Sequence, residues 1–246
     1  MGWLPSLAMS PPSYRQHRFR RPPGATELLL VRHGESEPSV PDRPFPLVDG
    51  HGDPALATQG RAQAEAVAAR LAHQGVEAIY VSPLRRTSET AAPLAARLGL
   101  EPIMEAGICE VFLGEWEGGA LRQRVAEGDP IAARLFAEER WDVIPGGEPA
   151  DQFADRVRAA VGRIVAAHPD GRVAVFSHGG VICEILRQAT GSRPFAFIGV
   201  DNGSISHLVV IGDRWVARRV NDTAHLPGDL DLDPAPDLPE STGFSA

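Results

Sequence analysis

Three short segments of this sequence combine histidine, arginine and glycine in a way that suits chemistry on a phosphate group. In chain order they are Arg32-His33-Gly34, Arg85-Arg86 and His178-Gly179-Gly180. The planar guanidinium of arginine matches the geometry of a tetrahedral oxyanion, and a cluster of two is unfavourable unless an anion lies between them. Glycine removes the side chain where the backbone must approach such a group closely. The residue types therefore predict a phosphate site.

The elements that must position these segments begin with short apolar runs of strand length. Residues 28–31, 78–81 and 173–176 are such runs, and one of the three segments follows shortly after each. Helices are predicted over residues 59–72, 86–98, 150–167 and 181–189, and a hairpin over 204–210 and 215–220. Strands alternating with helices predict an α/β fold, with three α/β/α layers around a mainly parallel central sheet. Ligands of such sheets bind at the carboxyl ends of the strands, where the three segments lie.

With a fourth segment added, the chain contains four motifs: LVRHGE (30–35), SPLRRTSETA (82–91), CEVFLGEWEG (109–118) and FSHGG (176–180). In these motifs the sequence resembles the histidine phosphatase superfamily, which also contains the cofactor-dependent phosphoglycerate mutases. The motifs occur in the family's order, and the similarity runs from about residue 28 to residue 220. The resemblance implies a phosphoglycerate mutase-like fold and chemistry on phosphate esters.

Carried over to this chain, the resemblance assigns a role to each catalytic candidate. His33 would be the nucleophile, and Glu110 would protonate the leaving oxygen and later take a proton from water. Arg32, Arg86 and His178 would bind the phosphoryl oxygens and the charge that builds on them. No metal ion and no cofactor are needed in this scheme.

Two positions need a choice or depart from the family pattern. Arg86 is preferred to Arg85 because the family's arginine falls four residues after the serine of its motif. Many members carry an asparagine seven residues after the first arginine, where this chain has Ser39. A serine hydroxyl can also donate to phosphate, so Ser39 and Gly179 complete the predicted phosphate-binding set.

The leading functional hypothesis is a phosphomonoesterase that hydrolyses a small phosphorylated metabolite through a phosphohistidine intermediate. A phosphoglycerate mutase, which returns the phosphoryl group to its substrate, is the first alternative. Mutases of this family usually have a longer insertion with extra basic residues, whereas the interval from Glu110 to His178 is moderate in length. Seven of its arginines alternate with acids, as on a solvated helix face; they are Arg122, Arg124, Arg134, Arg140, Arg156, Arg158 and Arg163. This pattern favours hydrolysis.

A non-catalytic module that binds a phosphorylated partner is the second alternative. It is disfavoured because a pure binder has no use for a nucleophile paired with an acid. A metal site built from His33, His178, His51 and Asp53 fits by composition but lacks the spacing typical of metal ligands.

Composition limits the partners. All 24 basic residues are arginine, which excludes a Schiff-base lysine and a P-loop lysine. The net charge of −8 argues against nucleic acid and anionic membranes as partners. Cys109 and Cys183, the two cysteines, are far apart in the sequence and suggest a reducing compartment, so a cytoplasmic location is expected. No apolar run is long enough to cross a membrane, and the oligomeric state stays open, with a homodimer among the options.

The predicted domain organisation is one catalytic domain between two tails. Residues 1–24 are rich in proline and arginine, and residues 226–246 are rich in proline and aspartate, so both are expected to be poorly ordered. Residues 25–225 form the catalytic domain. Within it, the loop 37–54 and the helices expected over 120–140 are the segments that should shape the substrate pocket.

Overall fold

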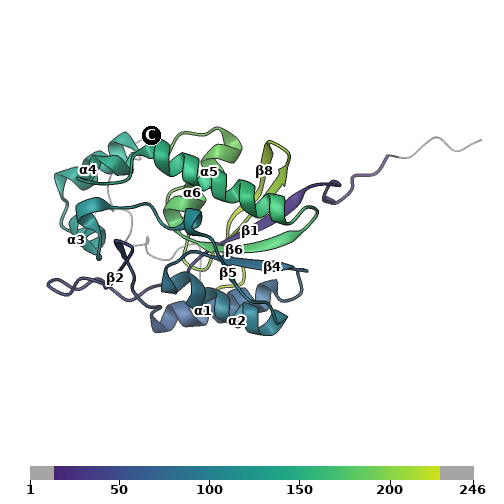
Figure 1. The fold of residues 1–246 in the computed structure, drawn as a ribbon, viewed down its shortest axis with the longest axis horizontal. Coiled ribbons are helices and arrows are strands. Elements are labelled where there is room, and N and C mark those ends of the chain that lie inside the picture. The colour runs from purple at the N-terminus through teal and green to yellow at the C-terminus, as the bar shows by residue number, and fades with distance from the viewer. Residues whose placement is uncertain (1–13, 228–246) are drawn as a thin grey trace, which may run out of the picture.

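A six-stranded sheet forms the centre of the structure, a computed structural model that describes residues 14–227. In spatial order its strands are β5 (Ile103–Met104), β4 (Ala78–Val81), β6 (Arg172–Ser177), β1 (Thr26–Arg32), β7 (Ile205–Ile211) and β8 (Arg214–Asp222). The first four run parallel, and β7 and β8 are antiparallel additions at one edge (Figure 1). The predicted mainly parallel sheet is therefore confirmed.

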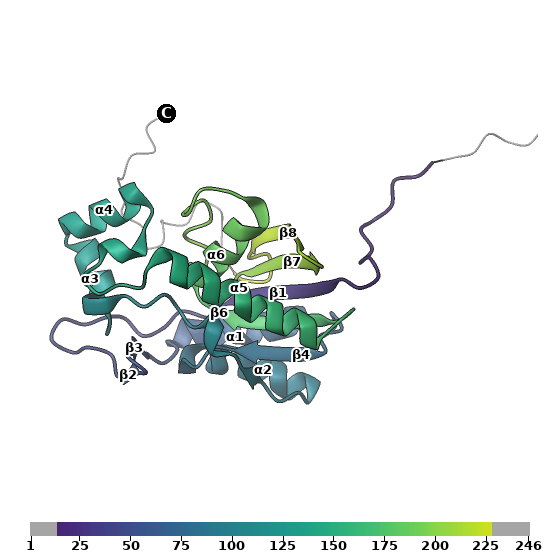
Figure 2. The ribbon, with the colours of Figure 1, turned by 45° about the horizontal axis from the view of Figure 1, so that its top comes forward.

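Helices cover both faces of this sheet (Figures 1 and 2). One face carries α1 (Thr58–Leu71) and α2 (Arg85–Leu98), and the other carries α5 (Ala150–Ala167) and α6 (Gly179–Thr190). The three-layer arrangement expected from the alternating pattern is thus observed. Helix α5 begins and ends at the predicted residues. Its buried positions, among them Val157, Val161 and Ile164, recur every three or four residues, as expected for a helix with one face on the sheet.

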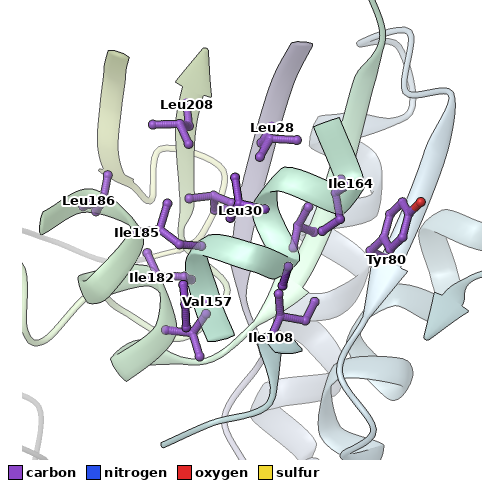
Figure 3. Packing of buried hydrophobic residues seen from close by; sticks show 14 of the residues in the cluster. Leu28, Leu30, Tyr80, Ile108, Val157, Ile164, Ile182, Ile185, Leu186 and Leu208 are labelled. Carbon is purple, nitrogen blue, oxygen red and sulfur yellow. The ribbon is translucent and has the colours of Figure 1, made fainter. Parts of the chain in front are cut away.

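Strand β1 shows why the central strands read as continuous apolar runs. Leu28 and Leu30 pack with α5 and α6, as Figure 3 shows, whereas Leu29 and Val31 pack with α1 and α2. Successive side chains of a strand point to opposite faces, so a strand covered on both sides must be apolar throughout. This burial fixes the register of β1 and the place where its polar C-terminal residues emerge.

A third group of short elements lies toward one end of the sheet (Figure 2). It comprises η2 (Gly114–Trp116), α3 (Ala120–Ala126), α4 (Pro130–Glu138) and η3 (Trp141–Val143), and we call residues 114–143 the cap. The cap has an apolar cluster around Trp116 and Leu135, which Ile144 and Phe195 from outside the cap complete. A short ribbon of β2 (Leu47–Val48) and β3 (His51–Gly52) and the turn η1 (Ala106–Ile108) complete the elements.

The predicted tails fall partly outside the described residues, since 1–13 and 228–246 are not among them. Residues 14–24 contain no helix or strand, yet the Arg218 guanidinium lies 3.8 Å from the centre of the Phe19 ring. Arg21 also pairs with Glu27 at 3.6 Å. Over residues 14–227, no helix has the length and hydropathy that a membrane span requires.

Candidate active site

His33 lies immediately beyond β1, in a position that the neighbouring strand and loops fix. Its backbone N–H donates to the carbonyl of Ser177 at 3.0 Å, and its carbonyl accepts from the side chain of Asn202 at 2.9 Å. The ring Nδ1 lies 2.7 Å from the carbonyl of Gly34. Because a carbonyl only accepts, Nδ1 carries the proton in this contact, and Nε2 of a neutral ring keeps its lone pair.

A close backbone contact with α1 supports this loop. A Cβ atom on Gly34 would lie 2.4 Å from the carbonyl oxygen of Gly60, and one on Gly60 would lie 2.0 Å from that of Glu35. Only glycine fits at both positions. The N–H of Gly34 also donates to Thr90 on α2 at 3.0 Å, so the first two sequence motifs hold each other.

His178 lies just before α6, and its ring centre is 5.2 Å from that of His33, with the two planes at 62°. Its Nε2 lies 2.8 Å from the hydroxyl oxygen of Ser82, which is also hydrogen-bonded to Thr87. The side chain is fully buried, and within the described residues its Nδ1 has no hydrogen-bond partner. A buried polar atom in this condition is the exception in folded proteins and suits a site that accepts a ligand.

Arg32 and Arg86 enter the same cavity from different elements. The Arg32 guanidinium donates to the carbonyl of Val200 at 2.5 Å, and that of Arg86 donates to the carbonyl of Gly52 at 2.9 Å. Arg86 is only 8% exposed, so its charge is largely removed from water. Arg85 instead pairs with Glu89 at 3.1 Å and does not line the cavity.

Burial and positive charge act together on the two imidazoles. Burial, followed by the guanidinium groups of Arg86 and Arg32, holds the pKa of His33 well below its ordinary value of 6.5. Burial and Arg86 lower the pKa of His178 in the same direction. Both rings are therefore neutral at physiological pH, which is the form a nucleophile requires.

Glu110 reaches the cavity from the segment after η1. Its carboxylate accepts the N–H of Val111 at 3.0 Å and that of Gly180, at the start of α6, at 3.1 Å. The half-buried Glu110 is close enough to Arg86 to act on its pKa, which burial lowers and this carboxylate raises. An acid, two imidazoles and two guanidinium groups thus meet at the carboxyl ends of β1 and β6.

The cavity itself has a volume of about 170 Å³ and runs from these groups toward the cap. Arg32, His33, Arg86, Glu110 and Gly179 line it. His178 does not line it directly, since it lies buried beside His33. Ser39 is also outside the lining: its hydroxyl donates to the carbonyl of Gly119 at 3.0 Å and accepts from Gln123 at 2.7 Å, so it ties the loop to α3.

Two arginines that the sequence pattern assigned to a solvated helix face have other positions. Arg122 lines the cavity, donates to the hydroxyl of Ser36 at 2.7 Å and contributes to lowering the pKa of His33. Arg156 binds the backbone beside Glu110, as described below. The alternation of acids and bases misled here because both side chains leave their helices toward loops that are distant in sequence.

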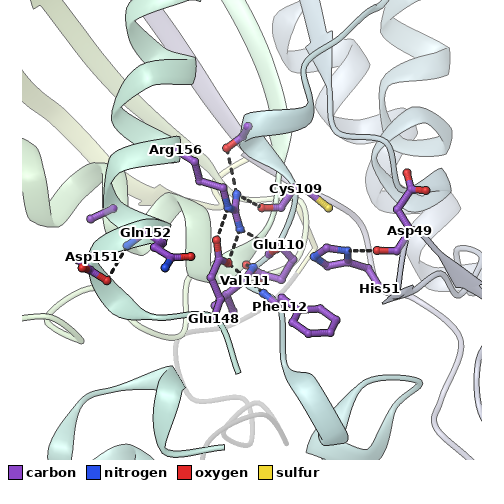
Figure 4. A network of polar contacts seen from close by, with 12 residues as sticks. Asp49, His51, Cys109, Glu110, Val111, Phe112, Glu148, Asp151, Gln152 and Arg156 are labelled. Carbon is purple, nitrogen blue, oxygen red and sulfur yellow. Dashed lines mark hydrogen bonds and ion pairs between the residues drawn. The ribbon is translucent and has the colours of Figure 1, made fainter. Parts of the chain in front are cut away.

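Arg156 organises the segment that carries Glu110 (Figure 4). Its guanidinium donates to the carbonyls of Gly107 at 3.0 Å, Cys109 at 2.7 Å and Glu110 at 2.9 Å. The same group pairs with Glu148 at 2.6 Å. No motif in the sequence marks Arg156; its spacing on an amphipathic helix was the only signal, and that spacing does not show what the side chain contacts.

Cysteine and metal chemistry receive no support from the side chains around the site. Burial raises the pKa of Cys109, next to Glu110, to about 12, so its thiol stays protonated. Among residues 14–227, histidine, cysteine and acidic side chains do not gather in groups of three or more that could hold a metal ion. Asp53, one of the considered ligands, accepts the N–H of Arg85 at 2.8 Å instead.

Comparisons with known proteins agree with this geometry. The chain is 35% identical over 207 residues to phosphoglycerate mutase-like protein 4 of Arabidopsis thaliana, an alignment that covers 81% of this chain and 86% of that one. It is 34% identical over 205 residues to phosphoserine phosphatase 1 of Hydrogenobacter thermophilus, covering 81% and 94%. The solved structure of a mycobacterial glucosyl-3-phosphoglycerate phosphatase with VO3 is similar, with a TM-score of 0.68, 30% identity and coverage of 80% and 99%.

The predicted class of enzyme, a phosphoric monoester hydrolase, agrees with these phosphatase relatives. The family model of the histidine phosphatase superfamily (branch 1) matches residues 28–223, which include all four motifs and the whole central sheet except the first two residues of β1. The chain belongs to the histidine phosphatase superfamily.

Proposed function

We propose that this protein hydrolyses phosphomonoesters of small molecules through a phosphohistidine at His33. Nε2 of His33 attacks phosphorus, the bond from phosphorus to the ester oxygen breaks, and Glu110 gives its proton to the departing alcohol. Water then attacks the phosphohistidine, Glu110 takes a proton from that water, and the phosphorus–nitrogen bond breaks to release phosphate. Each turnover returns both side chains to their starting state.

The observation that carries the proposal is the meeting of His33 and His178 beside the guanidinium groups of the buried Arg86 and the half-buried Arg32. The ring centres lie 5.2 Å apart, and Arg32 and Arg86 line the cavity next to them. Clustered positive charge is unfavourable in a buried site unless an anion offsets it. A phosphoryl group bound in the cavity would accept from Arg32 and Arg86 and would offset their charge.

The arrangement also favours the transition state over the bound ester. Negative charge builds on the phosphoryl oxygens during transfer, and fixed donors in a water-poor site stabilise this charge without reorganising. Arg32 and Arg86 are each held by a backbone carbonyl, so their positions are set before substrate arrives. Ser39 binds Gly119 and Gln123 instead, and the proposed phosphate site does not depend on it.

Phosphoglycerate mutase activity is the alternative, and the cap argues against it. Arg124, Arg134 and Arg140 pair with the neighbouring acids Asp129, Glu138 and Asp142, at 3.6, 3.0 and 2.9 Å. None of these three arginines lines the cavity, so they are not placed to hold a second charged group of the substrate. Incubation with 3-phosphoglycerate and a trace of 2,3-bisphosphoglycerate should release phosphate. Rapid isomer formation with negligible release would establish the mutase reaction instead.

Trapping the intermediate tests the proposal directly. Protein quenched at alkaline pH during turnover of p-nitrophenyl phosphate should carry the mass of one phosphoryl group on His33, and the group should be lost in acid. His33→Ala should lack the label and nearly all turnover. A label on another residue, or full activity of the variant, would overturn the mechanism. Phosphate binding without turnover of any ester would favour a non-catalytic module.

A cytoplasmic location stays a prediction, consistent with two free, buried cysteines.

A further inference from the structure

The cavity has two chemically different ends. Besides the groups at the phosphate end, it is lined by apolar side chains from the cap and from the segments beside it. These are Phe45, Leu113, Trp116, Leu121, Val125, Phe136, Trp141 and Ile198. Most of them belong to the cap's apolar cluster but are only partly buried within it. The part of these side chains that stays exposed forms one side of the cavity, which we call the wall.

The aromatic part of this wall is held in place from behind. The ring centre of buried Phe195 lies 5.0 Å from that of Trp141 and 6.4 Å from that of Phe136, the latter edge to face. Such ring pairs stabilise one arrangement of the side chains. The wall is therefore ordered before a ligand arrives, and an apolar group bound there would displace water from apolar surface.

The charges that the cap contributes to the cavity do not favour a second anionic group. Over the described residues, they are those of Arg122 and Glu117, which have opposite signs. Both oxygens of Glu117 accept backbone N–H groups, from Gly52 at 2.7 Å and from Leu113 at 2.9 Å. Arg122 is held toward the phosphate end, by Ser36 at 2.7 Å and by the carbonyl of Glu37 at 3.0 Å.

From these observations we infer that the substrate is a phosphate monoester of an uncharged, apolar alcohol or phenol, of about the size of one ring or a short branched chain. The inference rests on the proposed hydrolysis at His33 and adds the chemical class of the leaving group. The whole cavity, phosphate end included, has a volume of about 170 Å³, and an apolar protein cavity of about 150 Å³ holds benzene, so the alcohol can be no larger than about one ring. A carboxylate-bearing phosphate ester would place its second charge against the apolar wall, where desolvation is unfavourable.

Four esters that all release a primary alcohol test the inference without a large change in leaving-group chemistry. They are 3-methylbutyl phosphate and benzyl phosphate on one side, and O-phosphoserine and 3-phosphoglycerate on the other. We expect kcat/KM to be about tenfold or more higher for the apolar pair, because differences in pocket burial reach this magnitude. Equal values, or a preference for the carboxylate-bearing pair, would overturn the inference.

Variants of the wall separate recognition from folding. Phe136→Ala and Leu121→Gln should each lower kcat/KM for benzyl phosphate severalfold while leaving that for O-phosphoserine nearly unchanged. Ile131→Ala is the matched control, because Ile131 packs against the same cluster but does not line the cavity. If both wall variants slow all four esters alike while their melting temperatures match that of the control, the wall does not select the leaving group.

The two proposals fail in different ways. If neither p-nitrophenyl phosphate nor any of the four esters is hydrolysed, hydrolysis at His33 is refuted, and calorimetric titration with the four esters still measures the binding preference. Tighter binding of benzyl phosphate than of O-phosphoserine would keep the assignment of the apolar subsite. The reverse order would refute it, whatever the outcome for catalysis.

Discussion

The N–H of Gly180 donates to Oε2 of Glu110 at 3.1 Å, and a Cβ atom at position 180 would lie 2.6 Å from Oε1 of the same carboxylate. The two residues are separated by 70 positions in the sequence, and their contact joins the segment after η1 to the first turn of α6. This contact fixes the orientation of the carboxyl group relative to the first turn of the helix. An alanine at position 180 would therefore force this carboxylate to move.

Gly180→Ala should therefore displace the Glu110 carboxylate and lower kcat by about tenfold or more for alkyl phosphates, with a smaller effect on KM. The matched control is Gly162→Ala on α5, where an added Cβ meets nothing within 4 Å. Steady-state kinetics and thermal melting of both variants check the prediction. Unchanged kcat in a folded Gly180→Ala protein would mean that the position of this carboxylate does not limit the reaction.

Glu110→Gln tests the acid role itself. The amide cannot protonate a departing alcohol, so esters with poor leaving groups should slow by about 100-fold or more, in the range typical of general acid catalysis. The good leaving group of p-nitrophenyl phosphate needs little protonation, so its release should slow much less. Kinetics of phosphoenzyme formation for a series of esters measure this dependence. An equal loss for both kinds of ester would contradict the role of Glu110.

The pH dependence follows from the lowered pKa of His33. Protonation removes the lone pair of Nε2, so activity is lost as the pH falls through the folded pKa. Burial, Arg86 and Arg32 all lower that pKa, and the acid limb of kcat/KM should accordingly lie below pH 6.5. Profiles measured from about pH 4 to pH 8, corrected for ionisation of the ester, check this position.

Arg86→Gln tests whether the positive charge of Arg86 lowers the pKa of His33 and thereby sets the position of the acid limb of kcat/KM. Removing this positive charge takes away the second-largest cause of the lowered pKa, so the acid limb should move to higher pH. Turnover should also fall, because Arg86 binds the phosphoryl group in the proposed mechanism. Arg85→Gln is the control, since Arg85 pairs with Glu89 and does not line the cavity. An acid limb that stays in place in Arg86→Gln would show that the charge does not act on His33.

The sheet and its helices could be predicted from the sequence because their signals are local. The apolar run in β1 and the periodic positions of α5 are read within one element, and the structure confirms both. Strand β5 was not predicted, because Ile103 and Met104 form only a two-residue exposed edge strand. Pairing of so short a segment depends on β4 beside it, and a window of sequence carries no such information.

The candidate site could be predicted from the sequence for the same reason, where its residues directly follow strands. His33 and His178 come immediately after β1 and β6, and strand order alone brings them together. Arg122 could not be placed in this way. Its position depends on how α3 turns against the loop that contains Ser36, and helix periodicity does not fix the contact of a long side chain.

Arg156 provides the last prediction, since it holds three backbone carbonyls around Glu110 without touching the proposed substrate. Arg156→Ala leaves those carbonyls without their donor and Glu148 without its partner, so the free energy of unfolding should fall by about 1–3 kcal/mol. A purely structural role of Arg156 predicts only this loss of stability.

As a positioning residue, Arg156 should also affect leaving-group selectivity: hydrolysis of alkyl phosphates should slow more than that of p-nitrophenyl phosphate, as in Glu110→Gln. Arg156→Lys should restore only part of the rate, because an ammonium group cannot reproduce the planar fork. Arg158→Ala is the control on the same helix, where the guanidinium lies over Trp215, 5.3 Å from the ring centre. Equal slowing of both ester types in Arg156→Ala would assign Arg156 to stability alone.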